Sequence, residues 1–327
     1  MPDIVTLGES LIDMVSTQPG MGLVNSTEFE KAAGGAPTNV AAGVAALGVD
    51  AGLISKVGDD HFGAFLRQTL QDVEVDLGHF IMTPDYETQL AFVAVSPEGV
   101  PDFSFHVKRS ADQMLASDEL IPQYIENAEI FHFGSITLIS EPVRSATLRA
   151  IDLAGDAGLL ISYDPNLRPP LWPDLDMAHH WITEGVGMCD VIKVSLEEMT
   201  FITGLEDPQR GMGALWDMGP ELVAVTRGGE GCYYLTEHTF GEVPGFQVPV
   251  DETTGCGDAF VAGMLVWLLE CEKDVSELED ADLQELFAFA NAAGALTATG
   301  KGAIPSLPSR EEVHELLGIE PEDDEDD

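Results

Sequence analysis

A glycine-rich turn that ends in a carboxylate, Asp258, directly precedes the apolar segment 260–269. Such a segment predicts a buried helix. A helix N-terminus presents unpaired N–H groups and the positive end of the helix dipole, and small residues there let an anion approach the backbone. We therefore expect an anion hole formed by the N–H groups of Gly255, Cys256 and Gly257.

Asp258 has two interpretations at this position. Aspartate is a favoured helix N-cap, which requires no ligand. A carboxylate is unfavourable beside a bound phosphate, however, so its presence indicates a second task, which is to accept the proton of a hydroxyl group that attacks phosphorus. A second glycine-rich turn favours this interpretation. Gly34 and Gly35 precede a small-residue helix predicted at 37–47, in which Asn39 offers donors and an acceptor suited to sugar hydroxyls.

These two turns carry a family resemblance. The chain resembles the ribokinase-like (PfkB) carbohydrate kinases, which have a Gly-Gly-x-x-x-Asn segment near the N-terminus and a Thr-Gly-x-Gly-Asp segment near the C-terminus. Further segments in the family's order look like those of fructokinases, and they lie at 8–13, 56–63, 164–173, 193–198, 289–295 and 301–308. The resemblance implies an ATP-dependent kinase that transfers the γ-phosphoryl group to a hydroxymethyl oxygen of fructose. Two alternatives stay open: a 2-keto-3-deoxygluconate kinase, which shares the segment around Arg168, and a non-catalytic sugar-sensing regulator on the same fold.

The resemblance also implies roles for residues at matching positions. Asp258 would deprotonate the sugar hydroxyl, and the anion hole would stabilise the developing charge. The sugar would contact Asp13, Gly34, Gly35, Asn39, Phe105, Arg109, Asn166 and Arg168. The nucleotide would contact Lys193, Ser195, Thr226, Gly228, Gly231 and Asn291.

Two metal sites are implied in the same way. Glu198 matches a glutamate associated with the Mg²⁺ of ATP, often through water. A monovalent-cation site, for K⁺, would involve Glu252, Thr254, Gly302 and Ser306. Glu252 stands where the family usually has aspartate, and its side chain is longer than the one that the family places at this site. A second departure lies in the lid, which lacks the family's aromatic-Arg pair; Lys108 or Arg109 could substitute for that arginine, with a changed substrate preference.

The charge of the chain is a separate constraint. It has 58 acidic and 14 basic residues, a formal net charge of -44. Self-repulsion of this size destabilises a compact fold in dilute buffer, whereas in about 1 M salt the Debye length is roughly 3 Å. We therefore expect a protein from a salt-rich cytoplasm rather than an acidic surface for a basic partner. Nucleic-acid binding is contradicted by the charge. Because ATP is itself anionic, Lys193, Arg168 and Arg227, with bound Mg²⁺, must offset the charge locally.

Length and patterning predict an α/β fold: a ribokinase-like three-layer arrangement with a mainly parallel central sheet and a small β-sheet lid. Strands are predicted at 4–8, 51–56, 130–133, 159–164, 191–194, 222–226 and 232–235. Helices are predicted at 37–47, 62–72, 142–156, 196–203, 256–270, 283–299 and 310–317. Alternating apolar residues at 89–95 and 102–107 flank a turn at 96–99 and predict a β-hairpin.

The predicted organisation is one kinase domain, 1–318, followed by an acidic tail, 319–327. Within that domain the lid would comprise about 15–33 and 88–112, and lids of this family often pair, so a homodimer is expected. The four cysteines have no paired spacing, so neither disulfides nor zinc is expected. The N-terminus lacks a basic signal region and no stretch of 18 apolar residues exists, so we expect a cytoplasmic protein that does not enter a membrane.

Overall fold

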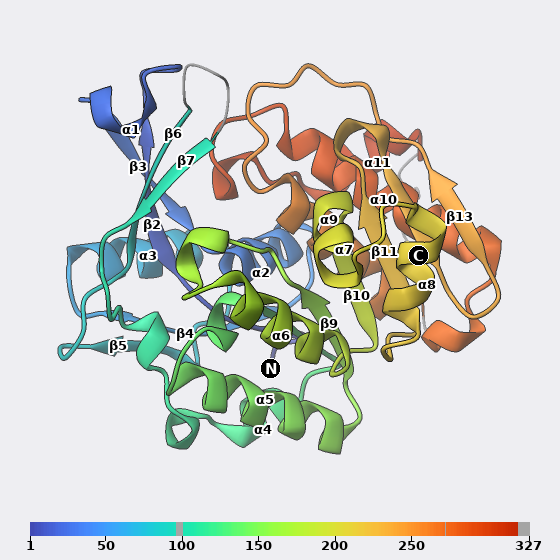
Figure 1. Ribbon diagram of the computed structural model, residues 1–327, viewed down its shortest axis with the longest axis horizontal. Helices are drawn as coiled ribbons and strands as arrows, with labels where there is room; N and C mark the ends of the chain where they lie inside the picture. Colours follow the sequence, from blue (N-terminus) through green and yellow to red (C-terminus); the bar gives the residue numbers. More distant parts are fainter. Residues whose placement is uncertain (96–100, 272, 320–327) are drawn as a thin grey trace, which may run out of the picture.

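A large sheet of nine strands forms the centre of the computed structural model (Figure 1), which describes residues 1–95, 101–271 and 273–319. Its spatial order is β13-β12-β11-β10-β9-β8-β1-β4-β5. The strands are β1 (Ile4–Leu7), β4 (Ala51–Gly58), β5 (Phe80–Thr83), β8 (Ile130–Gly134), β9 (Leu160–Asp164), β10 (Val191–Ser195), β11 (Leu222–Thr226), β12 (Cys232–Leu235) and β13 (Phe240–Val243). Every neighbouring pair from β5 through β4, β1, β8, β9 and β10 to β11 is parallel. The pairs β11–β12 and β12–β13 are antiparallel.

Helices cover both faces of the large sheet. One layer contains α2 (Ala36–Ala46), α3 (His61–Asp72), α9 (Cys256–Glu270), α10 (Asp280–Thr297) and α11 (Arg310–Leu317). The other contains α4 (Pro122–Glu126), α5 (Val143–Ala157), α6 (Leu175–Val186), α7 (Leu196–Thr203) and α8 (Pro208–Trp216). Alternate strand residues face the two layers: Leu222 of β11 belongs to the first core and Val223 to the second. The predicted three-layer α/β fold is therefore confirmed.

A second sheet of four strands stands apart from the large one, at the upper left of Figure 1, in the order β3-β2-β6-β7. Its strands are β2 (Leu11–Ser16), β3 (Phe29–Gly34), β6 (Leu90–Val95) and β7 (Pro101–Phe105), and the short helix α1 (Gly22–Asn25) connects β2 to β3. The pairs β2–β3 and β6–β7 are antiparallel, whereas β2–β6 is parallel. The predicted hairpin is thus present, although its turn at 96–99 lies outside the described residues.

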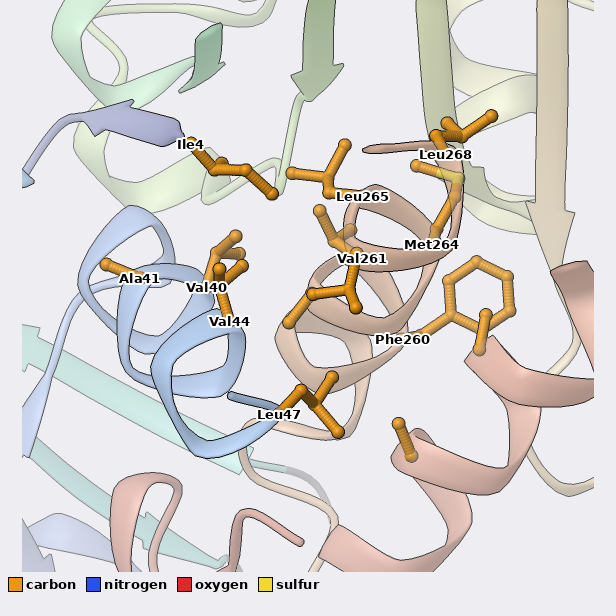
Figure 2. Packing of buried hydrophobic residues seen from close by; sticks show 14 of the residues in the cluster. Ile4, Val40, Ala41, Val44, Leu47, Phe260, Val261, Met264, Leu265 and Leu268 are labelled. Carbon is orange, nitrogen blue, oxygen red and sulfur yellow. The ribbon is translucent and has the colours of Figure 1, made fainter. Parts of the chain in front are cut away.

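Helices α2 and α9 pack closely against each other. Figure 2 shows Val40 and Val44 of α2 facing Val261 of α9. A Cβ atom on Gly43 would lie only 2.7 Å from Cβ of Ala262, so the bare glycine permits the short distance between the helices. Because α2 begins after Gly35 and α9 after Gly255, this packing brings the two glycine-rich turns together.

The predicted elements are present with small shifts at their ends. The largest is in α10, which begins at Asp280 rather than at 283. The sequence did not predict β5, β13, α1, α4, α6 and α8. Among the residues that the model describes, no helix combines the length and the apolar character needed to cross a bilayer. The acidic tail lies beyond the described residues from 320 onward.

Candidate active site

A cavity of about 420 Å³ lies between the small sheet and the first turns of α2 and α9. The small sheet contributes Asp13 and Val15 of β2, Val93 of β6, and Phe103 and Phe105 of β7. The helix N-termini contribute Gly35, Asn39, Gly255, Gly257 and Asp258. Asn166, Arg168 and Lys193 complete the wall from the carboxyl ends of β9 and β10. Residues predicted from two distant glycine-rich turns therefore share one cavity.

Asp258 is buried in the first turn of α9, with 7% of its surface exposed. Asn39 Nδ2 donates a hydrogen bond to Asp258 Oδ2 at 2.8 Å, and Asn166 Nδ2 lies 3.5 Å from Asp258 Oδ1. The N-cap of α9 is Gly255, so the interpretation of Asp258 as a plain N-cap is wrong.

The pKa of Asp258 is set by opposing effects. Burial raises the pKa of this carboxyl to about 7, and the charge of Asp164 acts in the same direction. The hydrogen bond from Asn39 and the positive charges of Lys193 and Arg168 oppose the rise. A carboxyl group with a pKa near neutrality is suited to take up a proton during a reaction.

Lys193 places a positive charge beside the turn of α9. Its Nζ donates to Asp164 Oδ2 at 2.9 Å, and both side chains are buried. A Cβ atom on Gly257 would lie 3.1 Å from Lys193 Nζ, so the ammonium group sits against the backbone of the turn that was predicted to form an anion hole. Burial would lower the pKa of Lys193, but the carboxylates of Asp164, Glu198 and Asp258 raise it above the ordinary value. The group therefore stays charged where an anion would bind.

Asp13 lies inside β2 and lines the cavity. Burial raises the pKa of Asp13 to about 6. The positive charge of Arg168 opposes this rise, and the negative charge of Glu252 adds to it. A Cβ atom on Gly34 would overlap Asp13 Oδ2, so Gly34 makes room for this carboxyl group without lining the cavity itself. Gly35 has φ 109°, and a Cβ atom there would overlap the carbonyl oxygen of Glu9.

The cation that reaches the aromatic side of the cavity is Arg168. Its guanidinium carbon lies 5.9 Å from the centre of the Phe103 ring. Arg109, predicted to contact the sugar, lies outside the cavity lining: it is exposed, and its guanidinium group points to Met114 Sδ at 3.8 Å. The reason is its place in the loop after β7, beyond the part of that strand that faces the cavity.

Most residues predicted to contact the nucleotide lie outside this cavity. Ser195 and Thr226 are paired neighbours at the carboxyl ends of β10 and β11, next to Lys193. Gly228 (φ 57°) and Gly231 (φ 93°) shape the turn after β11. Asn291 is turned inward, because its Nδ2 donates to the carbonyl oxygen of Val243 at 3.3 Å. A ligand would have to extend from the cavity across the ends of β10 and β11 to reach this group.

Two of the predicted metal ligands, Glu198 and Glu252, accept hydrogen bonds from other groups of the protein. Glu198 accepts hydrogen bonds from the backbone N–H of Leu167 at 2.7 Å and of Ser195 at 2.8 Å, the second as part of the cap of α7. Glu252 accepts from Thr254 Oγ1 and from the N–H of Gly302. Within the described part of the chain, no three His, Cys, Asp or Glu side chains cluster as a metal site.

These bonds restrict what each metal site could be. Magnesium keeps most of its water shell and needs few protein ligands, so Glu198 fits it only through water. Glu252 joins the two loops that were expected to hold the monovalent cation, and Ser306 Oγ is buried without a hydrogen-bond partner in the described structure.

The sequence interpretation gave no site role to several residues that line the cavity, among them Glu9 and Phe103. Glu9 lies two residues after the end of β1 and is 2% exposed, yet it lines the cavity. Phe103 was predicted only as part of the hairpin. The signal for Glu9 was present as a carboxylate at the carboxyl end of a buried parallel strand, which is where such sheets place their ligand-binding residues.

Comparison with known proteins agrees with this geometry. Residues 1–310 match the family model described as pfkB family carbohydrate kinase. The chain is 46% identical over 319 residues to "Probable fructokinase-6, chloroplastic" of Arabidopsis thaliana, covering 97% of this chain and 82% of that protein. The crystal structure of fructokinase with bound ATP from Xylella fastidiosa superposes with a TM-score of 0.88 at 32% identity, over 97% of this chain and 99% of the other.

A fructokinase double mutant from Vibrio cholerae O395, in its fructose-, ADP- and potassium-bound form, superposes with a TM-score of 0.86 at 33% identity, over 96% of this chain and 98% of the other. The resemblance read from the two glycine-rich turns is thereby confirmed. The chain belongs to the pfkB family of carbohydrate kinases.

Proposed function

We propose that the chain is an ATP-dependent fructokinase. The observation that carries this proposal is Asp258, a single buried carboxyl group between the backbone turn of α9 and the hydrogen-bonding side chains Asn39 and Asn166. The similarity to fructokinases over nearly the whole chain supports fructose as the acceptor.

The sugar binds under the small sheet, against Asp13, Asn39 and Arg168. The Oδ1 atom of Asn39 is buried and has no partner within the described structure, so it can accept a hydrogen bond from a sugar hydroxyl group. Asp258 takes the proton of a sugar hydroxymethyl group while the oxygen of that group forms a bond to the γ-phosphorus of ATP. The bond between the γ-phosphorus and the ADP oxygen breaks, and ADP leaves. The N–H groups of Gly255, Cys256 and Gly257, with Lys193, stabilise the charge that develops on the phosphoryl oxygens. Mg²⁺, when bound with ATP, neutralises further phosphate charge.

Three proposals accompany this function. The small sheet acts as a lid that excludes water from the transferred phosphoryl group. The exposed apolar side chains of Met21 and Val24, 44% and 95% exposed, support a homodimer formed through this sheet. The charge of -44 supports a salt-rich cytoplasm as the working environment.

The deciding experiment measures ADP release in molar KCl with ATP, Mg²⁺ and either fructose or 2-keto-3-deoxygluconate. Fructose-dependent release, with the phosphorylated hydroxyl identified by NMR of the product, supports the proposal. Preference for 2-keto-3-deoxygluconate would replace the substrate, and no release with any sugar would favour a sugar-sensing regulator. Asp258→Asn should lower kcat by at least about 10²-fold while ATP binding is retained. Near-normal turnover of this variant would reject the assignment of Asp258.

A further inference from the structure

We propose that Glu9 is a further carboxylic acid of the site: one of its oxygens holds the first turn of α2, and the other, while it carries a proton, donates a hydrogen bond to the bound sugar. This inference rests on the proposed function. It concerns a residue to which neither glycine-rich turn assigns a role.

Glu9 is tied to α2 by three contacts. Its Oε1 accepts a hydrogen bond from the N–H of Ala36 at 2.9 Å, and its carbonyl oxygen accepts from Thr38 Oγ1 at 2.8 Å. The third contact is with Gly35: because glycine has no Cβ atom, the carbonyl oxygen of Glu9 can lie against its backbone. One carboxyl oxygen is therefore fixed, and the side chain has little freedom to rotate away from the cavity that it lines.

The surroundings of Glu9 disfavour a negative charge. No lysine, arginine or histidine forms an ion pair with it in the described ranges. The charged groups that act on it are Asp112, from the 3₁₀ helix Asp112–Met114, and Asp258 of α9. The cavity also holds Asp13, Arg168, Lys193 and Glu252. A carboxylate that is buried near two others and has no cation paired with it is strongly disfavoured in its ionised form, so Glu9 retains its proton.

Burial shifts the pKa values of Asp112, Asp258 and Glu9 by different amounts, and the order of these values suits the proposed arrangement. Burial raises the pKa of Asp112 to about 6, that of Asp258 to about 7 and that of Glu9 to about 8. For Glu9, the backbone N–H groups of Glu9 and Ala36 oppose the effect of burial, and the charges of Asp112 and Asp258 add to it. Between about pH 7 and 8, Asp258 is able to accept a proton while Glu9 is still able to donate one.

The test is the pH dependence of kcat/KM for fructose, which reports groups of the free enzyme. In the wild type we expect a fall above about pH 8, as Glu9 loses its proton. Glu9→Gln keeps an acceptor for Ala36 and a donor toward the sugar but does not titrate. Relative to its own value at pH 7, its kcat/KM at pH 9.5 should exceed that of the wild type by about 30-fold.

Asp112→Asn is the matched control, because it removes a neighbouring charge and leaves Glu9 in place. It should keep the alkaline fall but move it to lower pH, since Asp112 raises the pKa of Glu9. A Glu9→Gln profile that falls above pH 8 as the wild type does would overturn the proposal. So would an alkaline fall that Asp112→Asn leaves at the same pH.

A second measurement does not depend on the reaction. Difference infrared spectra of substrate-free wild type and Glu9→Gln should show a protonated carboxylic acid band at pH 7 that belongs to Glu9 and disappears as the pH rises past about 8. Absence of this band would overturn the inference even if the enzyme phosphorylates fructose. Its presence in a protein without kinase activity would reject the proposed function and leave the protonated Glu9 standing.

Discussion

Removing the amide of Asn39 should make the base of the site harder to ionise. Asn39 donates the shorter of the two side-chain hydrogen bonds to Asp258, at 2.8 Å, and this bond lowers the pKa of the carboxyl group. A hydrogen bond to a charged group contributes about 1.5 to 3 kcal/mol. Since about 1.4 kcal/mol corresponds to one pKa unit, Asn39→Ala should move the ionisation of Asp258 upward by about one to two pH units.

The assay is kcat/KM for the sugar, measured across the acid side of the pH profile. Asn39 is also proposed to contact the sugar, so the maximal kcat/KM of the variant will fall as well. The pH at which kcat/KM reaches half of its maximum on the acid side therefore tests the prediction. The matched control is Asn166→Ala, because its Nδ2 lies 3.5 Å from Asp258 Oδ1, at the limit of a hydrogen bond. It should shift the midpoint by less than about half a pH unit. Equal midpoints in wild type and Asn39→Ala would refute the reasoning.

Three further predictions concern stability. The pKa of Asp258 is 3.8 in the unfolded chain and about 7 in the folded protein, so the free energy of unfolding of the wild type falls by up to about 4 kcal/mol as the pH rises between these values. Asn does not titrate, so the gain in thermal stability of Asp258→Asn over the wild type should grow from pH 5 to pH 8. A gain that stays constant over this range would contradict the prediction. Gly43→Ala should lower the free energy of unfolding, measured in urea, by about 1 to 3 kcal/mol, because the added Cβ atom meets Ala262. The control Gly213→Ala places its Cβ atom in open space on α8 and should raise this free energy by about 0.4 to 1 kcal/mol. Similar effects of the two substitutions would argue against close packing of α2 and α9. Finally, the melting temperature should rise between about 0.1 M and 2 M KCl because the net charge of -44 is screened, and a flat or falling curve would count against self-repulsion.

The fold was largely predictable because its buried strands are short apolar runs. Strand β11, for example, was predicted with both ends correct. The elements that were missed have weaker local signals: α8 contains Gly211 and Gly213, which disfavour a helix, and β5 is a short strand at the edge of the sheet. Packing against the second core stabilises α8 despite its composition.

The site was predictable only where the chain is locally distinctive. The two glycine-rich turns identified Asn39 and Asp258, and the structure joins them by a hydrogen bond. Glu9 could not be placed from the sequence, because its contact with Ala36 depends on how β1 and α2 meet in three dimensions. Arg109 differs from Glu9: it is a charged residue near a predicted lid strand that was assigned to the sugar, and it lies outside the cavity lining with its guanidinium group beside Met114.

Two of the connections between the small sheet and the rest of the molecule are very short and lie beside the cavity. Only residues 8–10 separate β1 from β2, and only Gly35 separates β3 from α2. If the two sheets rotate relative to each other, the pivot must therefore include Glu9 and Gly35, which line the cavity themselves. Binding of a ligand and the hinge motion would then be mechanically inseparable, and substitutions that stiffen these joints should alter affinity and turnover together.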